Sequence, residues 1–343
     1  MSSPSSDGSP ATGHAAGAAG GGPRLGPVVV MSFNRSDYLR ETLVSIAAQP
    51  SVAAGLREVH LFQDGAVNFH SGDRYATDEA IAASIATFRE IFPQGTVHAS
   101  DLNIGIALNF DRAERYVFLN RRFDSAAFFE DDMVLGPHYL ATLQRFLDFA
   151  ADPASDGLIG YVAAYGHHKA SLQDQLRRRR EVLQVGHAWG YGVTRRHWLD
   201  VREIIDPYIK IVSDCDYRKR PKAKIGGFHK QLGLARQALS QDSMKLIATS
   251  LLGRTRIMPY ICQARYVGQE GVNFTPEAFA KRGYGGEVIF PEEQVDFAWP
   301  EPARLRAMVE FERAPMAQQC KEAYGERDLP VPPFRTFFAA EHL

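Results

Sequence analysis

The sequence predicts an α/β fold built around a mostly parallel, doubly wound sheet. Short apolar runs typical of strands alternate with amphipathic helical segments four times in succession between residues 26 and 151. This order is typical of parallel strands that are joined by helical crossovers. The composition is that of a globular protein, with 45% hydrophobic and 23% charged residues in a chain of 343.

The first strand and helix show the pattern most clearly. Residues 26–33, GPVVVMSF, are a β-branched run that predicts a buried strand. In the segment that follows, Leu39, Leu43 and Ile46 recur at helical spacing, and Asp37 is a candidate N-cap.

The rest of the first half repeats this unit. Three further strands share the apolar or alternating character and are expected at residues 57–65, 96–100 and 125–132. The helices that follow the four strands are expected at residues 34–49, 74–92, 104–120 and 138–151. Ligands of such sheets bind at the carboxyl ends of the strands. The residues at these ends are Asn34-Arg35, Asp64-Gly65, Asp101 and Glu130-Asp131-Asp132.

The second half is less regular. Extended segments are expected at residues 158–166, 182–193 and 256–267, and helices at residues 173–181, 195–205 and 241–253. The basic stretch 216–227, DYRKRPKAKIGG, contains proline and glycine and is predicted to be a mobile loop.

The chain is expected to consist of one large domain with two flanking segments. Residues 1–24 are rich in Ser, Gly, Ala and Pro and predict a disordered tail. The domain is expected at 25–290, with a nucleotide-binding half at 25–135 and an acceptor-side half at 136–290. Residues 291–343 are expected to be a C-terminal covering segment.

Charge and cysteine content exclude several classes of function. The formal net charge of −1 gives no general attraction for nucleic acid. The three cysteines are far apart and form no CxxC pair, which is typical of reduced thiols in a cytoplasmic protein. No apolar run approaches the roughly 20 residues of a membrane-spanning helix. We therefore expect a cytoplasmic protein with no transmembrane segment.

The apolar run AAFF at 126–129 ends in three consecutive carboxylates, Glu130, Asp131 and Asp132. Burying such charges without a partner costs several kcal/mol, so a cation is expected near them. Mn²⁺ and Mg²⁺ take oxygen ligands, often one or two carboxylates together with phosphate oxygens and waters. The triplet therefore predicts a metal site shared with a diphosphate, and a solvated acidic turn is the alternative.

Two common phosphate-binding motifs are absent from the sequence. There is no GxxxxGK[ST] loop, and no GxGxxG follows the first strand, which ends in SFNRSDY. The charge of a bound nucleotide would then be neutralised by a metal and by basic side chains. Arg35 is a candidate for this role, although a surface arginine without a role is an equal alternative.

Several segments taken together resemble one family of enzymes. PVVVMSFNR, QDG, NIGIALN and FFEDD are similar to the nucleotide-binding half of GT-A glycosyltransferases. SQDSMK, RTRIMPYICQARYVG and QEGVNF follow in the order found in the GlcNAc-transferase I type (glycosyltransferase family 13) or related family 2-like enzymes. The resemblance covers about residues 27–275.

The resemblance implies roles for residues on the donor side. Asp132 takes the place of the metal-binding aspartate, and Glu130 and Asp131 would contact ribose, sugar or metal-bound waters. Asp64 would lie against the nucleoside base, and Arg35, next to Asn34, would lie near the diphosphate.

It also implies roles in the second half. Asp242 takes the place of the catalytic base, and Trp189 falls in the region that walls the sugar pocket. Gly268 begins the loop that orders over the donor, and in this loop Asn273 replaces a phosphate-binding serine. The residues alone leave another reading open, because Ser240 or Asp242 could simply cap the following helix.

The function implied is a metal-dependent inverting glycosyltransferase that uses a nucleotide-sugar donor, a UDP-sugar in the first instance. Animal members of the family are anchored in the Golgi membrane, and this sequence shows no such anchor. The acceptor is therefore expected to be a saccharide, a glycoconjugate or a small molecule with a free hydroxyl or amine. A sugar-nucleotide nucleotidyltransferase and a non-catalytic glycan-binding or partner-binding module are the alternatives.

Overall fold

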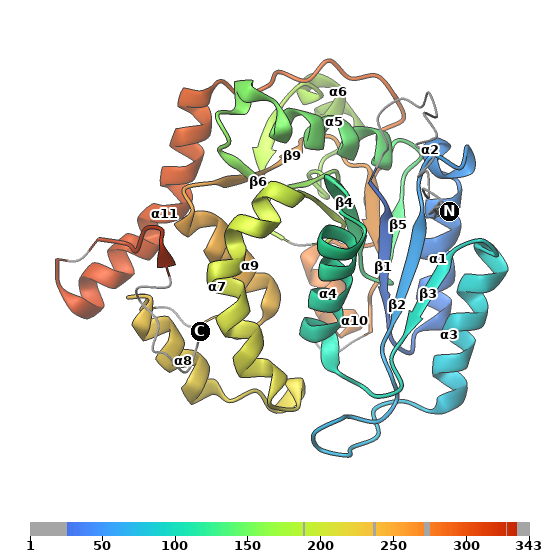
Figure 1. Cartoon of the computed structure of the whole chain (residues 1–343). Helices are drawn as coiled ribbons and strands as arrows, with labels where there is room; N and C mark the ends of the chain where they lie inside the picture. Colours follow the sequence, from blue (N-terminus) through green and yellow to red (C-terminus); the bar gives the residue numbers. More distant parts are fainter. Residues whose placement is uncertain (1–25, 188, 236–237, 271–274, 327, 335–343) are drawn as a thin grey trace, which may run out of the picture.

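The structure is a computed structural model that describes residues 26–334 except 188, 236–237, 271–274 and 327. The predicted tail at 1–24 and the predicted contact of Asn273 lie outside the described residues. The described chain forms one eight-stranded sheet covered by helices on both faces, together with a two-stranded ribbon (Figure 1).

The large sheet has the strand order β3-β2-β1-β4-β8-β6-β9-β7. Its strands are β1 (Val28–Ser32), β2 (Val59–Gln63), β3 (Thr96–Ala99), β4 (Ser125–Phe129), β6 (Ile159–Ala163), β7 (Val182–Gln184), β8 (Tyr191–Thr194) and β9 (Thr255–Pro259). Neighbouring strands are parallel from β3 to β4 and between β6 and β9, whereas β8 and β7 are antiparallel to their neighbours. The prediction of a mostly parallel α/β sheet is confirmed.

Successive side chains of a strand point to opposite faces of the sheet, and helices cover both faces. In β1, Val28 and Val30 belong to a core shared with α1, α3 and α5, whereas Val29 and Met31 belong to a core shared with α4 and α7. Both sets are almost completely buried, because a central strand of a doubly wound sheet is covered on both sides.

The helices of the first half follow the predicted order. They are α1 (Ser36–Ala47), α2 (Pro50–Ala53), α3 (Asp78–Ile91), α4 (Gly105–Arg115) with a π-helical extension (Tyr116–Asn120), and α5 (Tyr139–Ala151). Asp37 is not the cap of α1. Arg35 occupies the N-cap position without a side-chain cap hydrogen bond, and Asp37 lies in the first turn.

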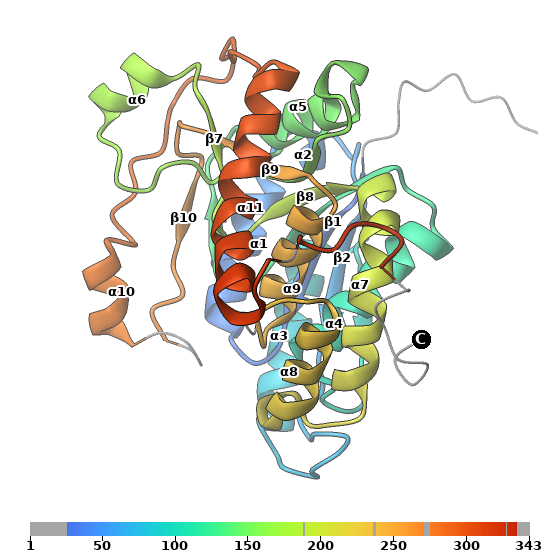
Figure 2. The ribbon, with the colours of Figure 1, turned by 90° about the vertical axis from the view of Figure 1, so that its left-hand side faces the viewer.

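The second half contains α6 (Leu172–Arg178), α7 (Arg195–Ser213), α8 (Lys222–Gln231), α9 (Gln241–Leu251), α10 (Pro276–Arg282) and α11 (Pro302–Tyr324). The expected strand at 182–193 is divided into β7 and β8. The helix α11 packs against β9 and α9 (Figure 2). No helix in the described part of the chain combines the length and the apolar character needed to cross a membrane.

The prediction of a mobile loop at 216–227 is wrong. Tyr217–Lys219 is a 3₁₀ turn, and α8 begins at Lys222. Ile225 and Phe228 are completely buried in a core that they share with α7 and α9, and this packing stabilises a helix whose other side is basic.

A short ribbon, which was not predicted, follows the acidic triplet. β5 (Met133–Leu135) pairs in antiparallel register with β10 (Ala264–Tyr266), so that Met133 lies opposite Tyr266. This pairing brings residues 264–268 beside Asp132, although the two segments are more than a hundred residues apart in the sequence.

Candidate functional site

The acidic triplet lies where β4 leaves the large sheet. Because β4 pairs with β1, with Phe129 opposite Val30, the residues that follow the two strands emerge at the same edge. Asp131 and Asp132 are 4% and 2% exposed, and Glu130 is half-buried. The triplet is therefore not an open acidic turn.

Arg35 supplies the cation that the triplet needs. Its guanidinium donates to Asp132 Oδ2 over 2.8 Å and also pairs with the carboxylate of Asp131. The Arg35 side chain is 28% exposed, so the pair is only partly shielded from solvent. The arginine following β1 thus neutralises carboxylates that follow β4, as expected for charges that cannot be buried alone.

The pKa values of the triplet reflect this balance. Burial raises the pKa of Asp131 to about 6 although the Arg35 guanidinium opposes the increase. Burial also raises the pKa of Asp132, again against Arg35. The pKa of Glu130 is raised well above its ordinary value by burial and by repulsion from Asp132, Asp242 and Asp131. One arginine does not compensate for all of these carboxylates.

Asp132 keeps one carboxylate oxygen free. Its Oδ1 is buried and has no hydrogen-bond partner among the described residues. Its backbone carbonyl accepts from Val267 N over 2.9 Å, and the Tyr266 hydroxyl bonds to its side chain. A Cβ on Gly268 would lie 2.5 Å from Asp132 Oδ2, so that position has room only for glycine.

These features fit a divalent cation that takes a single protein carboxylate. A buried, unpartnered carboxylate oxygen is a ligand that Mn²⁺ or Mg²⁺ would accept. No group of three His, Cys, Asp or Glu side chains within the described ranges is arranged to hold a metal. Any ion here would need phosphate oxygens or waters for its remaining positions, as the sequence analysis expects.

Aromatic rings border this site. The rings of Trp189 and Tyr266 are stacked with centroids 4.4 Å apart and planes 3° apart, and Tyr284 meets both edge-on. Tyr266 therefore links the ring stack to Asp132. Trp189 was a predicted wall of the sugar pocket, whereas Tyr266 was not singled out. Its distance from Asp132 in the sequence gave no signal of the contact.

Asp64 is occupied by hydrogen bonds within the protein. Its Oδ1 accepts from the backbone N–H groups of Gly65 and Ile104, and its Oδ2 accepts from Gly105 N–H and the Asn103 side chain, all within 3.0 Å. These contacts anchor the start of α4 to the end of β2. The predicted contact with a nucleoside base stays a prediction, and Asp64 has a structural role in any case.

Asp242 is not the helix cap. The hydroxyl of Ser240 accepts from Ser243 N–H over 3.2 Å and caps α9, whereas Asp242 lies in the first turn and accepts from the Gln241 side chain. Asp242 and Glu130 repel one another, so the two carboxylates lie close together in space. The structure thus brings Asp242 to the site that contains the triplet.

The other predicted residues surround this group. Asn34 is exposed next to Arg35, and Gly268 follows the β5–β10 ribbon. Lys245 and Glu114 were not predicted; they form a buried ion pair, and Lys245 lies one helical turn after Asp242. The spacing of Lys245, three residues after Asp242 on a helix, was the signal that could have identified it.

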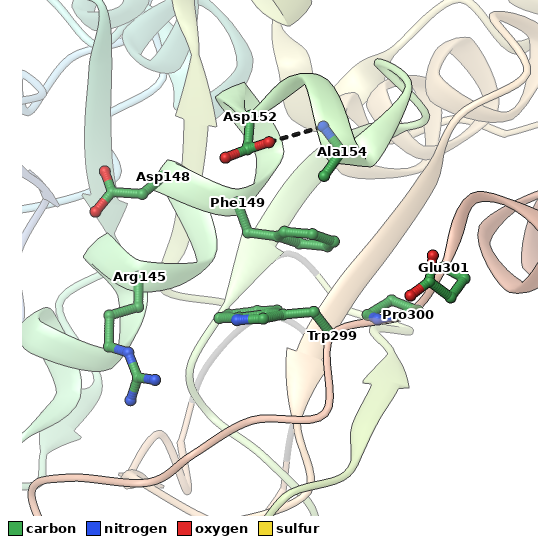
Figure 3. Close-up of a pocket in the computed structure, with 8 residues that line it drawn as sticks. All are labelled: Arg145, Asp148, Phe149, Asp152, Ala154, Trp299, Pro300 and Glu301. Atoms are coloured by element: carbon green, nitrogen blue, oxygen red, sulfur yellow. Dashed lines mark hydrogen bonds between the residues drawn. The ribbon is translucent and has the colours of Figure 1, made fainter.

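Two surface pockets are lined by residues other than those of the candidate site. One of about 440 Å³ is at the far end of α5, where the Phe149 and Trp299 rings stack 4.5 Å apart between Arg145 and Glu301 (Figure 3). The other, of about 390 Å³, is lined by Phe69, Leu102 and neighbouring residues. The Phe149–Trp299 stack attaches the segment before α11 to α5.

Comparison with known proteins gives distant structural likenesses. No protein-family model matches the sequence, and no curated protein matches it. A mannosyltransferase from Pyrobaculum calidifontis, in complex with GDP-Man and Mn²⁺, is 16% identical over 91% of this chain and 67% of its own, with a TM-score of 0.43. GalNAc-T7 with UDP, GalNAc and Mn²⁺ is 8% identical over 91% of this chain, with a TM-score of 0.45.

A third similar structure is TarS from S. aureus, 14% identical over 53% of this chain, with a TM-score of 0.34. This chain spans 53% of the length of GalNAc-T7 and 29% of that of TarS. At these values the likenesses establish neither a family nor an activity for the protein.

Proposed function

We propose that this protein is a metal-dependent glycosyltransferase of the GT-A type. It would transfer a sugar from a nucleotide diphosphate donor, in the first instance a UDP-sugar, to an acceptor hydroxyl or amine. One observation carries the proposal. Two buried carboxylates and an arginine meet at the carboxyl end of a parallel sheet, and one oxygen of Asp132 is left without a partner. The acceptor would be a saccharide, a glycoconjugate or a small molecule.

Asp132 would hold Mn²⁺ or Mg²⁺, which when bound supplies a Lewis acid that stabilises the negative charge of the departing diphosphate. Arg35, with 28% of its side chain exposed, would offer its guanidinium to the same phosphates. The stacked rings of Trp189 and Tyr266 would form an apolar wall next to the sugar. Asp131 and Glu130 would accept hydrogen bonds from sugar or ribose hydroxyls.

Asp242 would act as the base of an inverting reaction. Its carboxylate would take the proton of the acceptor hydroxyl while the hydroxyl oxygen bonds to C1 of the sugar. The bond between C1 and the phosphate oxygen breaks, and its electron pair leaves with the diphosphate. Because Ser240 is the cap of α9, the carboxylate of Asp242 is not required to hold the start of the helix.

Donor binding is tested by calorimetry of UDP with and without Mn²⁺. The wild type should bind UDP more tightly with Mn²⁺, and Asp132→Ala should lose this difference. Asp101→Ala is the matched control, because Asp101 is also an aspartate that follows a strand of the sheet but is exposed. Full metal-dependent affinity in Asp132→Ala would rule out the assignment of Asp132.

The role of Asp242 is tested by turnover. UDP release from a panel of UDP-sugars, with simple saccharides as acceptors, should fall by about 10²-fold or more in Asp242→Asn, while the affinity for UDP is unchanged. Unchanged turnover in this variant would exclude Asp242 as the base.

A further inference from the structure

A buried ion pair between Lys245 and Glu114 lies near Asp242. Lys245 follows one turn later on α9, at the spacing that places two side chains on the same face of a helix. Its Nζ lies 2.5 Å from Glu114 Oε1 of α4 and 3.0 Å from the hydroxyl of Tyr191 in β8. Lys245 is 5% exposed and Glu114 is 1% exposed.

The geometry of this pair is tightly determined. Glu114 Oε1 also accepts from the Tyr191 hydroxyl over 2.9 Å, and Oε2 accepts from Trp198 Nε1 over 3.1 Å. The Lys245 ammonium lies 4.5 Å from the centre of the Phe110 ring. These contacts restrict the side chains of Lys245 and Glu114 to one arrangement between α9 and α4.

Apolar side chains of similar size could replace such a pair with little loss of stability. Desolvation of two charges usually cancels most of their attraction, so a buried ion pair is weak evidence of a stabilising role. The position of this pair, within one helical turn of the proposed base, indicates a different role.

Two carboxylates, Glu114 and Glu130, disfavour the charge of Asp242, and four tyrosines also lie around it. The titratable groups that act on it from the elements around it are Glu114, Glu130, Tyr161, Tyr191, Tyr208 and Tyr217. Burial raises the pKa of Asp242, and Glu114 raises it further, whereas Lys245 lowers it. Without Lys245, burial and Glu114 would both raise the pKa of Asp242 and so favour its protonated form, which cannot accept a proton.

We propose that Lys245, held in place by Glu114, is a positioning residue that keeps Asp242 ionised and directed toward the acceptor. The proposal rests on the proposed role of Asp242 as the base. Lys245 touches neither donor nor acceptor in this scheme; it acts through Asp242. Glu114 in turn limits how strongly Lys245 attracts Asp242, because the ammonium is paired directly with the Glu114 carboxylate and acts on Asp242 only at longer range.

Substituting Lys245 and substituting Glu114 should shift the titration midpoint of Asp242 in opposite directions. Lys245→Met removes the attraction and should raise the titration midpoint of Asp242 by about one pH unit or more. Glu114→Gln removes a repulsion and frees Lys245, so the midpoint should fall. A purely structural pair would instead give changes in the same direction, because either substitution breaks the same contact.

The midpoint is measured directly by NMR on protein with ¹³C-labelled aspartate carboxyl groups. The Asp242 signal is assigned by its absence in Asp242→Asn. This measurement needs no substrate, so its result is independent of whether the protein is a transferase. Failure of the proposed function would show instead as unchanged turnover in Asp242→Asn.

The matched control is a second buried ion pair at the other end of α9. Arg256 and Glu312 lie 3.0 Å apart with side chains 10% and 9% exposed, and Glu312 also accepts from Ser250. Glu312→Gln should lower the melting temperature and leave the Asp242 midpoint unchanged. Lys245→Arg retains the cation and should keep the midpoint near its wild-type value.

Three results would overturn the proposal. These are an unchanged midpoint in Glu114→Gln, shifts of the same sign in Glu114→Gln and Lys245→Met, and a shift in Glu312→Gln as large as that in Lys245→Met. If Lys245→Met does not fold, the sign of the shift in Glu114→Gln decides, because the glutamine retains the size and most of the hydrogen bonds of the original side chain.

Discussion

Gly268→Ala should weaken binding of a metal and nucleotide through contact with Asp132. A Cβ built at this position lies 2.5 Å from Asp132 Oδ2 and 2.7 Å from the Tyr266 hydroxyl. Ordinary van der Waals contacts begin at 3.4 Å, so the new Cβ and Asp132 Oδ2 would have to separate by about 0.9 Å more. Asp132 is 2% exposed and paired with Arg35, so it cannot move outward without losing that pair.

The expected loss of affinity follows from this displacement. Changes that misplace a metal ligand typically reduce metal affinity by about 10- to 100-fold, or about 1.4 to 2.8 kcal/mol. Overpacking at a closely packed position also lowers the free energy of unfolding, by about 1 to 3 kcal/mol. The variant should therefore fold with a reduced melting temperature and bind UDP in Mn²⁺ at least about tenfold more weakly.

The assay is calorimetric titration of UDP with and without Mn²⁺, together with thermal unfolding. Gly227→Ala is the matched control, because a Cβ at this exposed position of α8 meets no atom within 4 Å. The control should bind UDP as the wild type does and be more stable by about 0.5 to 1 kcal/mol. A folded Gly268→Ala protein with wild-type affinity in Mn²⁺ would refute the reasoning.

Three further predictions concern other parts of the structure. Gly166→Ala should lower the free energy of unfolding, measured by urea titration, by about 3 kcal/mol or more. Gly166 has a φ of +78°, and a Cβ at this position would lie 1.9 Å from the Ile261 carbonyl oxygen. Unchanged stability would contradict this prediction. Burial, together with His60 and the Arg112 and Arg121 guanidinium groups, lowers the pKa of His98 from 6.5 to about 4, so between these pH values the unfolded chain binds a proton that the folded protein does not. The free energy of unfolding should therefore fall as the pH decreases from 6.5 to 4, and urea titrations at each pH should show a smaller fall for His98→Phe; an equal fall would refute the assignment. Tyr266→Phe removes a hydroxyl that bonds to Asp132 and should weaken UDP binding in Mn²⁺ by about three- to tenfold in calorimetry, and an unchanged affinity would show that the hydroxyl is dispensable.

The first half of the sheet could be predicted from the sequence because its strands and helices show clear local hydrophobic patterns. The run VVVMS of β1 is buried at every position, and α1, α3, α4 and α5 were all expected, whereas the short helix α2 was not. The place of the acidic triplet could be predicted for the same reason, since the triplet directly follows an apolar strand. Periodicity within a few residues was sufficient for each of these inferences.

Helix α8 was missed because its local signals point elsewhere. Its charges, two glycines and a preceding proline are typical of a loop, and only Ile225 and Phe228 favour an ordered element. Their complete burial depends on α7 and α9, which are supplied by tertiary packing. The cap of α9 was ambiguous for a related reason: Ser240 and Asp242 are both good caps, and only the path of the backbone selected Ser240.

The sequence by itself determined an α/β chain with carboxylates at a strand end and a basic residue, Arg35, after the first strand, because these features depend on neighbours along the chain. Only the tertiary structure placed Gly268 and Tyr266 against Asp132, and Glu114 against Lys245. Each of these contacts joins residues that are more than a hundred positions apart in the sequence. Contacts of this kind form when the chain folds back on itself, and no local pattern encodes them.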